Sequence, residues 1–580
     1  MSIDTDIDEV HDDTERVSLW DRVGRPVGPY AWPLTLAGAV ILAAGCFFAW
    51  SYTSDVLDDL SINFYPGAVQ ILMIITAVFA VLFALMYRGP LNRLGEWLSS
   101  VLALRTLGLG STIFMVLVIA LIAIQSGGLV NVMPGAWVSF AGAVILLVGS
   151  AGLTPRAHRD PLHASLPSWV EILTIVVLLA IALFGAAYVL GIDDGTVFSL
   201  VVLFVGIIAL TLARAGFFTW VGIIAQTHRR VLMLGAVAVA LLFPFTQGGS
   251  DANMSIATQV LIFGTTALGL NIVVGLAGLL DLGYIAFLGA GSYVGATMSY
   301  STFATIGWKP PFLVVMLIGG GVAATLGLII GSPTLRVSGD YLAIVTLAFG
   351  EIFRLSMGNL DGQDGPKLTN GPNGIPAIPD LEIGSFNFGD THDVLGFTLG
   401  RFANYYFALL VLLAFVITVF TRLNDSRIGR GWIAIREDEK AAEAMGVNTF
   451  ALKLFAFAGG AFLAGLAGTI KAHHDVSVTP DQFIFLESAF LLAAVVLGGM
   501  GTVTGVLIGA TILKLLPEKL RFVADYRLLI FGLLLVVMMR FRPEGIIASK
   551  RRQLEFHEED EELATRIEEV HLVEEQEAKA

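Results

Sequence analysis

The chain has 580 residues, of which 56% are hydrophobic and only 14% are charged. Soluble globular proteins carry about a quarter charged residues, so this composition excludes an ordinary cytosolic enzyme. The apolar residues form long runs, such as Val69 to Tyr87 and Ile172 to Leu190, and a helix needs about 20 apolar residues to cross a bilayer. The sequence therefore predicts an all-α membrane protein with many spans.

The net charge of -14 comes from the two ends of the chain. The first 22 and the last 28 residues together contain 19 acidic and 4 basic residues. Acidic runs of this kind are typical of solvated tails, with an interaction tail as the alternative. We expect acidic cytoplasmic tails at 1–29 and 548–580. The single cysteine, Cys46, lies in the first apolar run and is expected to be a small buried residue.

Six apolar segments form an N-terminal extension over residues 30–230. They lie near residues 30–50, 65–87, 108–125, 135–153, 168–190 and 196–213. Alternate loops carry the basic residues, namely Arg88, Arg93 and Arg105, then Arg156 and Arg159, then Arg214, Arg229 and Arg230. Because cytoplasmic loops are enriched in Lys and Arg, these loops and the N-terminus are expected to face the cytoplasm.

Ten further segments follow within residues 231–547. They lie near 231–245, 257–274, 283–302, 312–331, 341–358, 403–421, 451–470, 485–500, 503–516 and 526–541. Sixteen crossings would return the C-terminus to the cytoplasm, beside Lys550, Arg551 and Arg552. Lys514, Lys519, Arg521 and Arg527 would then lie outside, against the rule, so one long helix or a re-entrant pair over Leu486 to Leu516 is an alternative.

Motifs for nucleotide, metal or catalytic chemistry are missing from the sequence. The nearest fragment to a phosphate loop, Gly365-Pro366-Lys367, lacks the spacing and the following hydroxyl. His473-His474 is a vicinal pair, whereas two ligands on one helix face need i, i+4 spacing. We expect no enzyme activity, no cofactor or metal bound by this chain, and no nucleic-acid partner.

Two glycine-rich stretches interrupt the apolar runs of the second half, around Gly275 to Gly291 and Gly498 to Gly509. Glycine in a membrane helix either permits close helix packing or marks a break where backbone groups line a cavity. Glu351 lies deep in another apolar run, where a carboxylate is costly and often functional. Arg354, three residues on, can pair with it on the same helix face, and this structural role is the alternative.

The loop 422–449 is the charged connection expected on the inner side. Trp432 to Met445 is a good helix former, and Gly446 follows where a C-terminal cap places a left-handed residue. Small residues let such a helix seat in a partner's groove while its charges set the register. A solvated helix at the membrane surface is the alternative.

The run Ala442-Glu443-Ala444-Met445-Gly446 resembles the Glu-Ala-Ala type motif of the coupling helix in ABC importer permeases. Several longer segments are similar to the LivM-type permeases of branched-chain amino acid importers: Gly269–Gly278, Leu335–Leu347, Thr369–Ile375 and Val496–Gly501. The resemblance covers about Val231 to Ile547. The chain departs from it at Asn370, where glycine is common, and at Val337-Ser338, where Leu-Arg is usual.

The resemblance implies a core of about ten helices at 231–547, preceded by about six extra helices. It implies that ATPase coupling involves Arg436, Glu439, Ala441, Ala442, Glu443, Ala444 and Gly446. It places the substrate path near Asn271, Gly275, Gly278, Gly283, Glu351, Gly498, Gly499 and Gly501. The implied setting is a prokaryotic inner membrane, with membrane lipid around the chain and both termini cytoplasmic.

The implied partners are a second, LivH-type permease, two cytoplasmic ATPase subunits that bind ATP and Mg, and an external solute-binding protein. The substrates would be Leu, Ile and Val. Permeases for urea or short-chain amides are closely similar and remain an alternative within the family. A secondary transporter with Glu351 as its proton site, and a membrane scaffold or sensor built on the first six spans, are alternatives outside it.

Overall fold

The computed structural model describes residues 25–53, 56–57, 60–92, 95, 97–154, 167–335, 341–363, 365–394, 396–520, 526–541 and 544–547. The chain divides into two compact units, Met1–Phe243 and Pro244–Ala580. Outside the described residues lie most of the N-terminal tail, the whole predicted C-terminal tail, residues 336–340 of the LivM-like segment, Arg93, Arg156, Arg159 and Arg521. The predicted boundary at 230/231 remains a prediction.

Unit 1 is a set of helices with short connections. Its helices are α2 (Ala31–Gly45), α3 (Ala68–Tyr87), α4 (Ser100–Gln125), α5 (Pro134–Ala151), α6 (Ser168–Gly191), α7 (Gly195–Arg214), α8 (Phe217–Thr227) and α9 (Arg229–Leu242), with short 3-10 turns at Arg25–Tyr30 and Leu129–Asn131. Helices α2 and α5 pack through Gly38 and Gly142, where any side chain would collide with the partner's backbone. This small-residue contact is the usual way for membrane helices to approach closely. The expected burial of Cys46 is confirmed.

Two elements of unit 1 differ from the sequence prediction. Helix α4 begins at Ser100 and not near 108, because Arg105 is accommodated inside it. The Arg105 guanidinium donates hydrogen bonds to the carbonyl oxygens of Ala151 at 3.3 Å and Leu153 at 3.0 Å. The segment Phe217–Thr227 was predicted to be loop and is helix α8; at 11 residues it is too short to span a bilayer.

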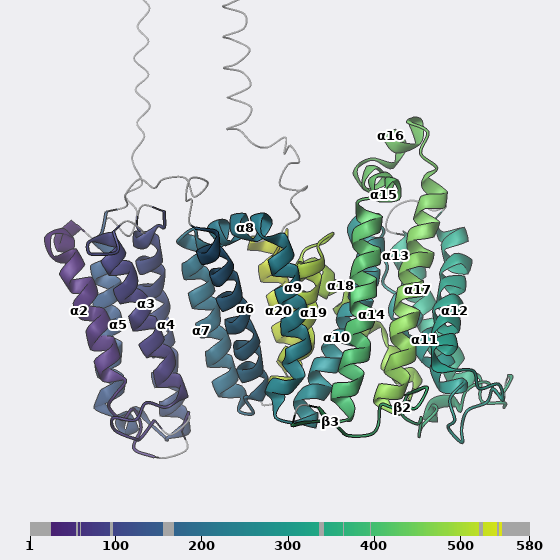
Figure 1. Cartoon of the computed structure of the whole chain (residues 1–580), viewed down its shortest axis with the longest axis horizontal. Helices are drawn as coiled ribbons and strands as arrows, with labels where there is room; N and C mark the ends of the chain where they lie inside the picture. The colour runs from purple at the N-terminus through teal and green to yellow at the C-terminus, as the bar shows by residue number, and fades with distance from the viewer. Residues whose placement is uncertain are drawn as a thin grey trace, which may run out of the picture. The chain divides into compact units, whose positions relative to one another are not determined.

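Unit 2 contains the remaining helices. They are α10 (Asp251–Asn271), continued by the π-helical turn η6 (Ile272–Leu276), α11 (Ile285–Thr297), α12 (Phe312–Thr334), α13 (Tyr341–Asn359), α14 (Arg401–Asn424), α15 (Arg427–Glu437), α16 (Glu439–Ala444), α17 (Thr449–Asp475), α18 (Phe485–Gly498), α19 (Val503–Lys519) and α20 (Arg527–Phe541), with short 3-10 turns at Phe243–Gln247, Gly371–Asn373 (η7) and Pro480–Phe483 (η8). Helix α17 packs against α10, α11 and α12. Figure 1 shows α15 and α16 projecting beyond the other helices at one end of this unit, hereafter the α16 end.

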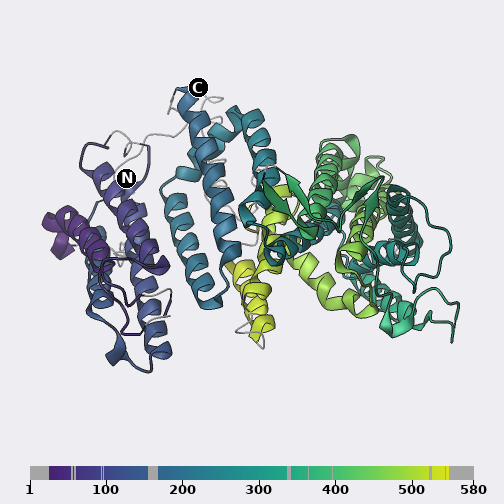
Figure 2. The same ribbon diagram turned by 60° about the horizontal axis from the view of Figure 1, so that its bottom comes forward.

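The opposite end of unit 2, hereafter the strand end, carries two short antiparallel hairpins. Strands β1 (Glu382–Ile383) and β2 (Phe386–Asn387) pair with Ile383 opposite Phe386. Strands β3 (His392–Val394) and β4 (Phe397–Leu399) pair with Asp393 opposite Thr398. These strands lie across the ends of the helices, as Figure 2 shows. The long polar loop between α13 and α14 thus has a structure of its own.

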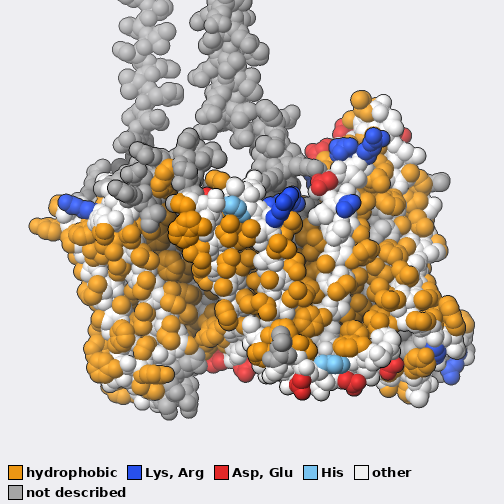
Figure 3. Space-filling view, viewed as in Figure 1, with side chains coloured by type: hydrophobic (Ala, Val, Ile, Leu, Met, Phe, Trp, Pro, Cys, Tyr) orange, Lys and Arg blue, Asp and Glu red, His pale blue; other side chains and the backbone are white. Residues whose placement is uncertain are grey.

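The all-α polytopic fold predicted from the sequence is confirmed. Each of the sixteen predicted segments contains a helix, and thirteen helices of the described residues are long and apolar enough to cross a membrane. The other three, α11, α19 and α20, have 13, 17 and 15 residues. Apolar side chains cover the flanks of the helices on the face drawn in Figure 3.

Leu486 to Leu516 forms two helices and not one. Helix α18 ends at Gly498 and α19 begins at Val503, and the two pack against each other. The turn between them contains Gly499, whose φ of +119° is one that residues with side chains rarely adopt. Lys514, a cation within α19, pairs with Glu487 of α18 at 3.1 Å, which explains how it is tolerated there.

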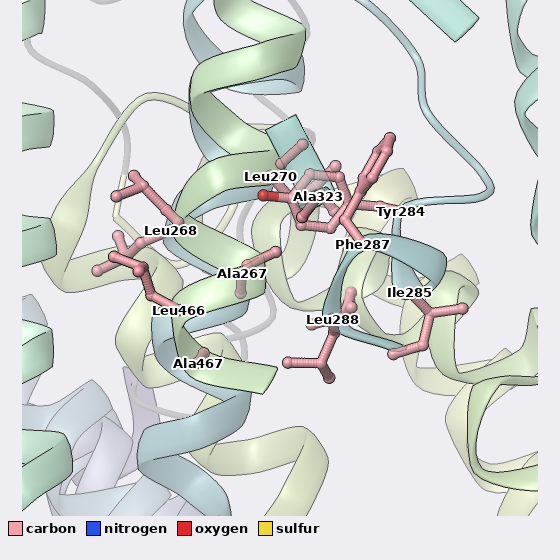
Figure 4. Close-up of a cluster of buried hydrophobic side chains, with 14 of the residues drawn as sticks. Ala267, Leu268, Leu270, Tyr284, Ile285, Phe287, Leu288, Ala323, Leu466 and Ala467 are labelled. Atoms are coloured by element: carbon pink, nitrogen blue, oxygen red, sulfur yellow. The ribbon is translucent and has the colours of Figure 1, made fainter. Parts of the chain in front are cut away.

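The core of unit 2 lies where α10, α11, α12 and α17 meet. Figure 4 shows Leu268 of α10, Phe287 of α11, Ala323 of α12 and Leu466 of α17 in one cluster. Each of these side chains is at most 2% exposed. Because many residues of the cluster are small, the helices approach closely and hold the connection between α10 and α11 in place.

Candidate functional site

The connection between α14 and α17 is tied to the core by one tryptophan. Ser426 caps α15 by accepting hydrogen bonds from the amides of Ile428 and Gly429. Trp432, halfway along α15, is fully buried and donates its indole N–H to the carbonyl of Leu452 at 2.7 Å. Its ring stacks on Phe455 of α17, with centroids 6.0 Å apart. Helix α15 is therefore held firmly against α17.

The single helix predicted from Trp432 to Met445 is wrong in one respect. The structure has two helices, broken at Asp438, whose backbone is extended with φ of -153° and ψ of 107°. The Asp438 carboxylate accepts hydrogen bonds from the amides of Lys440 and Ala441 and so caps α16. A capping aspartate begins a new helix more favourably than it continues an old one.

Helix α16 presents both small and charged side chains to solvent. Five of the predicted coupling residues, Glu439, Ala441, Glu443, Ala444 and Gly446, are exposed, as is Met445, which is 85% exposed. We call Ala441, Glu443, Ala444, Met445 and Gly446 the α16 surface. The predicted left-handed cap at Gly446 is confirmed by its φ of +85°.

Two of the predicted coupling residues contact α17. Ala442 is 5% exposed, and α16 packs on α17. Glu439 forms an ion pair with Lys453 of α17, whose side chain is 7% exposed. These contacts fix the direction in which the α16 surface points.

Arg436 connects α15 to the end of α10. Its guanidinium donates a hydrogen bond to the carbonyl oxygen of Gly275 at 3.0 Å. Its aliphatic part lies on Gly278, where a side chain would collide with it. The carbonyl of Gly275 belongs to η6, where the regular helix pattern changes and backbone groups become available to side chains.

Asn271 continues this connection to the turn between α18 and α19. Its amide oxygen accepts a hydrogen bond from the N–H of Gly501 at 2.8 Å, and its amide nitrogen donates to the carbonyl of Thr502 at 3.2 Å. Helix α15, η6 and the α18–α19 turn therefore form one contiguous chain of contacts through Arg436 and Asn271.

The remaining predicted path glycines are points of close backbone contact. A side chain at Gly283 would collide with the carbonyl of Thr346 in α13, and one at Gly498 with the carbonyl of Gly505 in α19. Gly499 approaches the carbonyl of Ile547 in the same way. Asn271, Gly275, Gly278, Gly498, Gly499 and Gly501 thus lie together near the α16 end, with Gly283 packed on α13.

Glu351 lies in another part of unit 2, on α13. Its carboxylate accepts hydrogen bonds from the Arg354 guanidinium at 3.0 and 3.1 Å. Arg354 also pairs with Asp481 of η8 at 3.2 Å. The Glu351 side chain is 43% exposed on this chain, although it lies within a helix long enough to span a membrane. The pairing with Arg354 that the sequence allows is therefore present in the structure.

Sequence reasoning missed three participants: Asp438, Lys453 and Thr502. Asp438 had a usable signal, because aspartate is a preferred N-cap residue: its carboxylate accepts hydrogen bonds from the amides two and three residues later. Lys453 and Thr502 had none, because their partners Glu439 and Asn271 lie on other elements.

Several known proteins are similar in sequence to this chain. The family described as "Branched-chain amino acid transport system / permease component" matches residues 253–539. The chain is 37% identical over 344 residues to the high-affinity branched-chain amino acid transport system permease protein LivM of Escherichia coli, covering 57% of this chain and 77% of that protein. The chain belongs to this permease family. The predicted resemblance is confirmed.

More distant relatives come from both types of permease. A probable LivM of Methanocaldococcus jannaschii is 26% identical over 343 residues, with 54% of this chain and 90% of that protein covered. LivH of Escherichia coli is 25% identical over 294 residues, with 48% and 89% covered. No solved structure matches the chain.

The match to the permease family lies within unit 2. It includes α15, α16, η6 and the turn between α18 and α19, so the contiguous contacts described above belong to the permease part of the chain. Residues 1–252 lie outside the family match.

Proposed function

We propose that the chain is the transmembrane permease subunit of an ATP-driven importer for Leu, Ile and Val. It has no ATPase site of its own in this proposal. ATP and Mg bind to two cytoplasmic ATPase subunits, an external binding protein delivers the substrate, and a LivH-type permease completes the pathway. Family membership supports the transport role, and the names of the relatives support the substrate.

The observation that carries the proposal is the geometry of α15 and α16. The α16 surface is exposed and combines two alanines and a glycine with Met445 and the charge of Glu443, so that a partner's groove can receive it and its charge can set the register. Arg436 lies on α15, the helix before α16, and donates to the Gly275 carbonyl. A movement of α15 and α16 would therefore be transmitted to η6 and to the α18–α19 turn. Two states that contact the ATPases differently would thereby open the path to opposite sides.

The orientation follows from the same proposal. If α16 docks an ATPase, the α16 end is cytoplasmic and the strand end faces the external binding protein. The basic loops of the first six spans support a cytoplasmic N-terminus by the positive-inside rule, and an even number of crossings would bring the C-terminus to the same side.

The test is a charge placed on the α16 surface. Ala444→Glu should abolish co-purification of the ATPase subunits and ATP-driven leucine uptake, because an unpaired charge would be buried in the interface. Ala444 is preferable to Ala442, which packs inside the chain. Gln226→Glu adds the same charge at an exposed position of α8, outside unit 2, and should change neither. Normal uptake by Ala444→Glu would refute the coupling role.

The alternatives separate in the same uptake assay. A proton-coupled carrier would accumulate substrate from a pH gradient without ATP and would lose uptake with Glu351→Gln. A permease for urea or short-chain amides would show ATP-driven uptake that those compounds, and not leucine, inhibit by competition.

A further inference from the structure

A cavity of about 520 Å³ lies inside unit 2 toward the strand end. Helices α10, α11, α14, α17, α18 and α19 contribute to its wall, and its volume falls within the range of small-molecule sites. None of the residues assigned above to coupling or to the substrate path lines it. The cavity therefore calls for an explanation of its own.

One side of the cavity carries ion pairs. Lys514 of α19 pairs with Glu487 of α18 at 3.1 Å and lies over the ring of Phe263, 4.8 Å from its centroid. Lys471 of α17 pairs with Asp475 one turn later. All five residues line the cavity. Ion pairs inside a membrane-embedded bundle are expensive to maintain and usually mark a site that handles polar or charged ligands.

His474 supplies the unpaired group. Its side chain is 2% exposed, and its Nδ1 lies 2.6 Å from the carboxylate of Asp475. Because a carboxylate only accepts, Nδ1 carries the proton, and in the neutral ring Nε2 presents a lone pair. This Nε2 is buried and has no hydrogen-bond partner within the described part of the chain. Such an atom calls for a donor from a ligand.

Helix α10 forms another part of the wall. Ser255 and Gln259, one turn apart, line the cavity with polar side chains. Apolar side chains complete the lining, among them Ile262 of α10 and Ile285 and Leu288 of α11. Figure 4 shows Ile285 and Leu288 within the core cluster. The cavity thus combines cations, a free acceptor and an apolar surface.

We propose that this cavity binds an α-amino acid zwitterion with an apolar side chain. The ligand ammonium donates to His474 Nε2, the ligand carboxylate lies among Lys471, Lys514, Ser255 and Gln259, and the side chain lies on Ile262, Ile285 and Leu288. The identity of the ligand rests on the proposed function. The site itself rests on the cavity and its orphaned acceptor.

The experiment measures binding of radiolabelled leucine to the assembled transporter in nanodiscs, without the external binding protein. The double variant Ser255→Ala/Gln259→Leu removes the two polar side chains that α10 contributes to the cavity. Alanine and leucine both favour helix, so α10 should stay folded. It should weaken binding about tenfold, or about 1.4 kcal/mol. His474→Gln should weaken binding by a similar factor.

The neighbouring histidine is the matched control. His473 lines a different cavity and its Nδ1 lies 2.8 Å from the Pro379 carbonyl. His473→Gln makes the same substitution at the adjacent residue, outside the cavity. It should leave the leucine affinity unchanged. A second arm repeats the measurement in nanodiscs with and without phosphatidylethanolamine, whose headgroup is also zwitterionic.

The outcomes separate the two claims. Unchanged leucine binding by both cavity variants, in a transporter that still imports leucine, overturns the amino-acid site and leaves the proposed function standing. Leucine binding that disappears when phosphatidylethanolamine is added would instead assign the cavity to lipid. A wild-type transporter that takes up no branched-chain amino acid refutes the proposed function, whatever the cavity variants do.

Discussion

Asp281 is a buried carboxyl in the connection between η6 and α11. Burial raises the pKa of its side chain from 3.8 to about 7, although hydrogen bonds from the Gly283 amide and the Thr346 hydroxyl oppose the shift. One carboxylate oxygen has no partner among the described residues. The folded protein therefore favours the protonated, neutral form of this side chain.

This pKa shift predicts a pH dependence of stability. Between about pH 4 and pH 7 the folded state holds a proton that the unfolded state has released, so stability is lost as pH rises to the folded pKa. The unfolding temperature of the purified protein should fall across that window. Asp281→Asn, which is always neutral, should flatten the curve, with a slope change of up to about 1.4 kcal/mol per pH unit.

The exposed Asp393 of β3 provides the control for that measurement. Asp393→Asn removes the same charge in solvent and should leave the pH profile of unfolding as it is in the wild type. If Asp281→Asn behaves like Asp393→Asn, burial of the Asp281 carboxyl has no energetic consequence.

Arg436 should matter for coupling more than for assembly. Arg436→Ala removes the charged hydrogen bond to the Gly275 carbonyl, which is typically a contribution of about 1.5–3 kcal/mol, and leaves the α16 surface unchanged. We expect the ATPase subunits to bind normally while leucine uptake per ATP hydrolysed falls about tenfold. Proteoliposome uptake together with phosphate release measures both quantities.

Arg430 offers a comparison on the same helix. It is exposed, and its guanidinium donates a hydrogen bond to the carbonyl of Asp425 at 3.4 Å. Arg430→Ala should therefore keep uptake and hydrolysis coupled. If Arg436→Ala takes up as much leucine per ATP hydrolysed as the wild type, the Arg436–Gly275 contact does not transmit movement to the α18–α19 turn.

At the scale of whole elements, α11, α12 and α17 are held together by glycine contacts. Gly291 of α11 meets the backbone of Gly465 in α17, and Gly468 meets the carbonyl of Leu288. In a bilayer, helices gain little from hydrophobic burial against each other, so this closeness of backbones contributes much of their association.

Gly291→Val should therefore separate α11 from α17. Overpacking of this kind typically costs about 1–3 kcal/mol, and the carbonyl it meets belongs to backbone that cannot rotate away. We expect a lower unfolding temperature and a lower yield of assembled complex. Gly459→Ala, also on α17 but with open space around its Cα, should be neutral, and equal behaviour of the two variants would contradict a packing role for Gly291.

At the scale of the whole molecule, the family match lies in unit 2 and leaves unit 1 unassigned. A chain lacking residues 1–227 keeps α9, with Arg229 and Arg230 at its start, so the positive-inside rule preserves the orientation of the core. We predict that this shortened permease still assembles and imports leucine. Loss of uptake despite correct insertion would show that unit 1 takes part in transport.

Local patterns in the sequence were enough to predict much of this architecture. Apolar runs of membrane-spanning length located the helices. Lipid offers no hydrogen-bond partner to the backbone, so a segment within it must form its own backbone hydrogen bonds as a helix. The left-handed cap at Gly446 was predicted for an equally local reason. The start of α4 was not, because Arg105 donates to the carbonyl of Ala151, 46 residues away at the end of α5, and local sequence does not reveal that contact.

Only the tertiary structure decided how these helices could work together. Arg436 and Gly275 are 161 residues apart, and Asn271 and Gly501 are 230 apart; neither contact has a sequence signature, since both join a side chain to a backbone group that any residue possesses. The cavity around His474 likewise draws on residues from Ser255 to Lys514. The sequence by itself determined which segments enter the membrane, because that depends on composition and length, whereas packing alone brought these distant polar groups together.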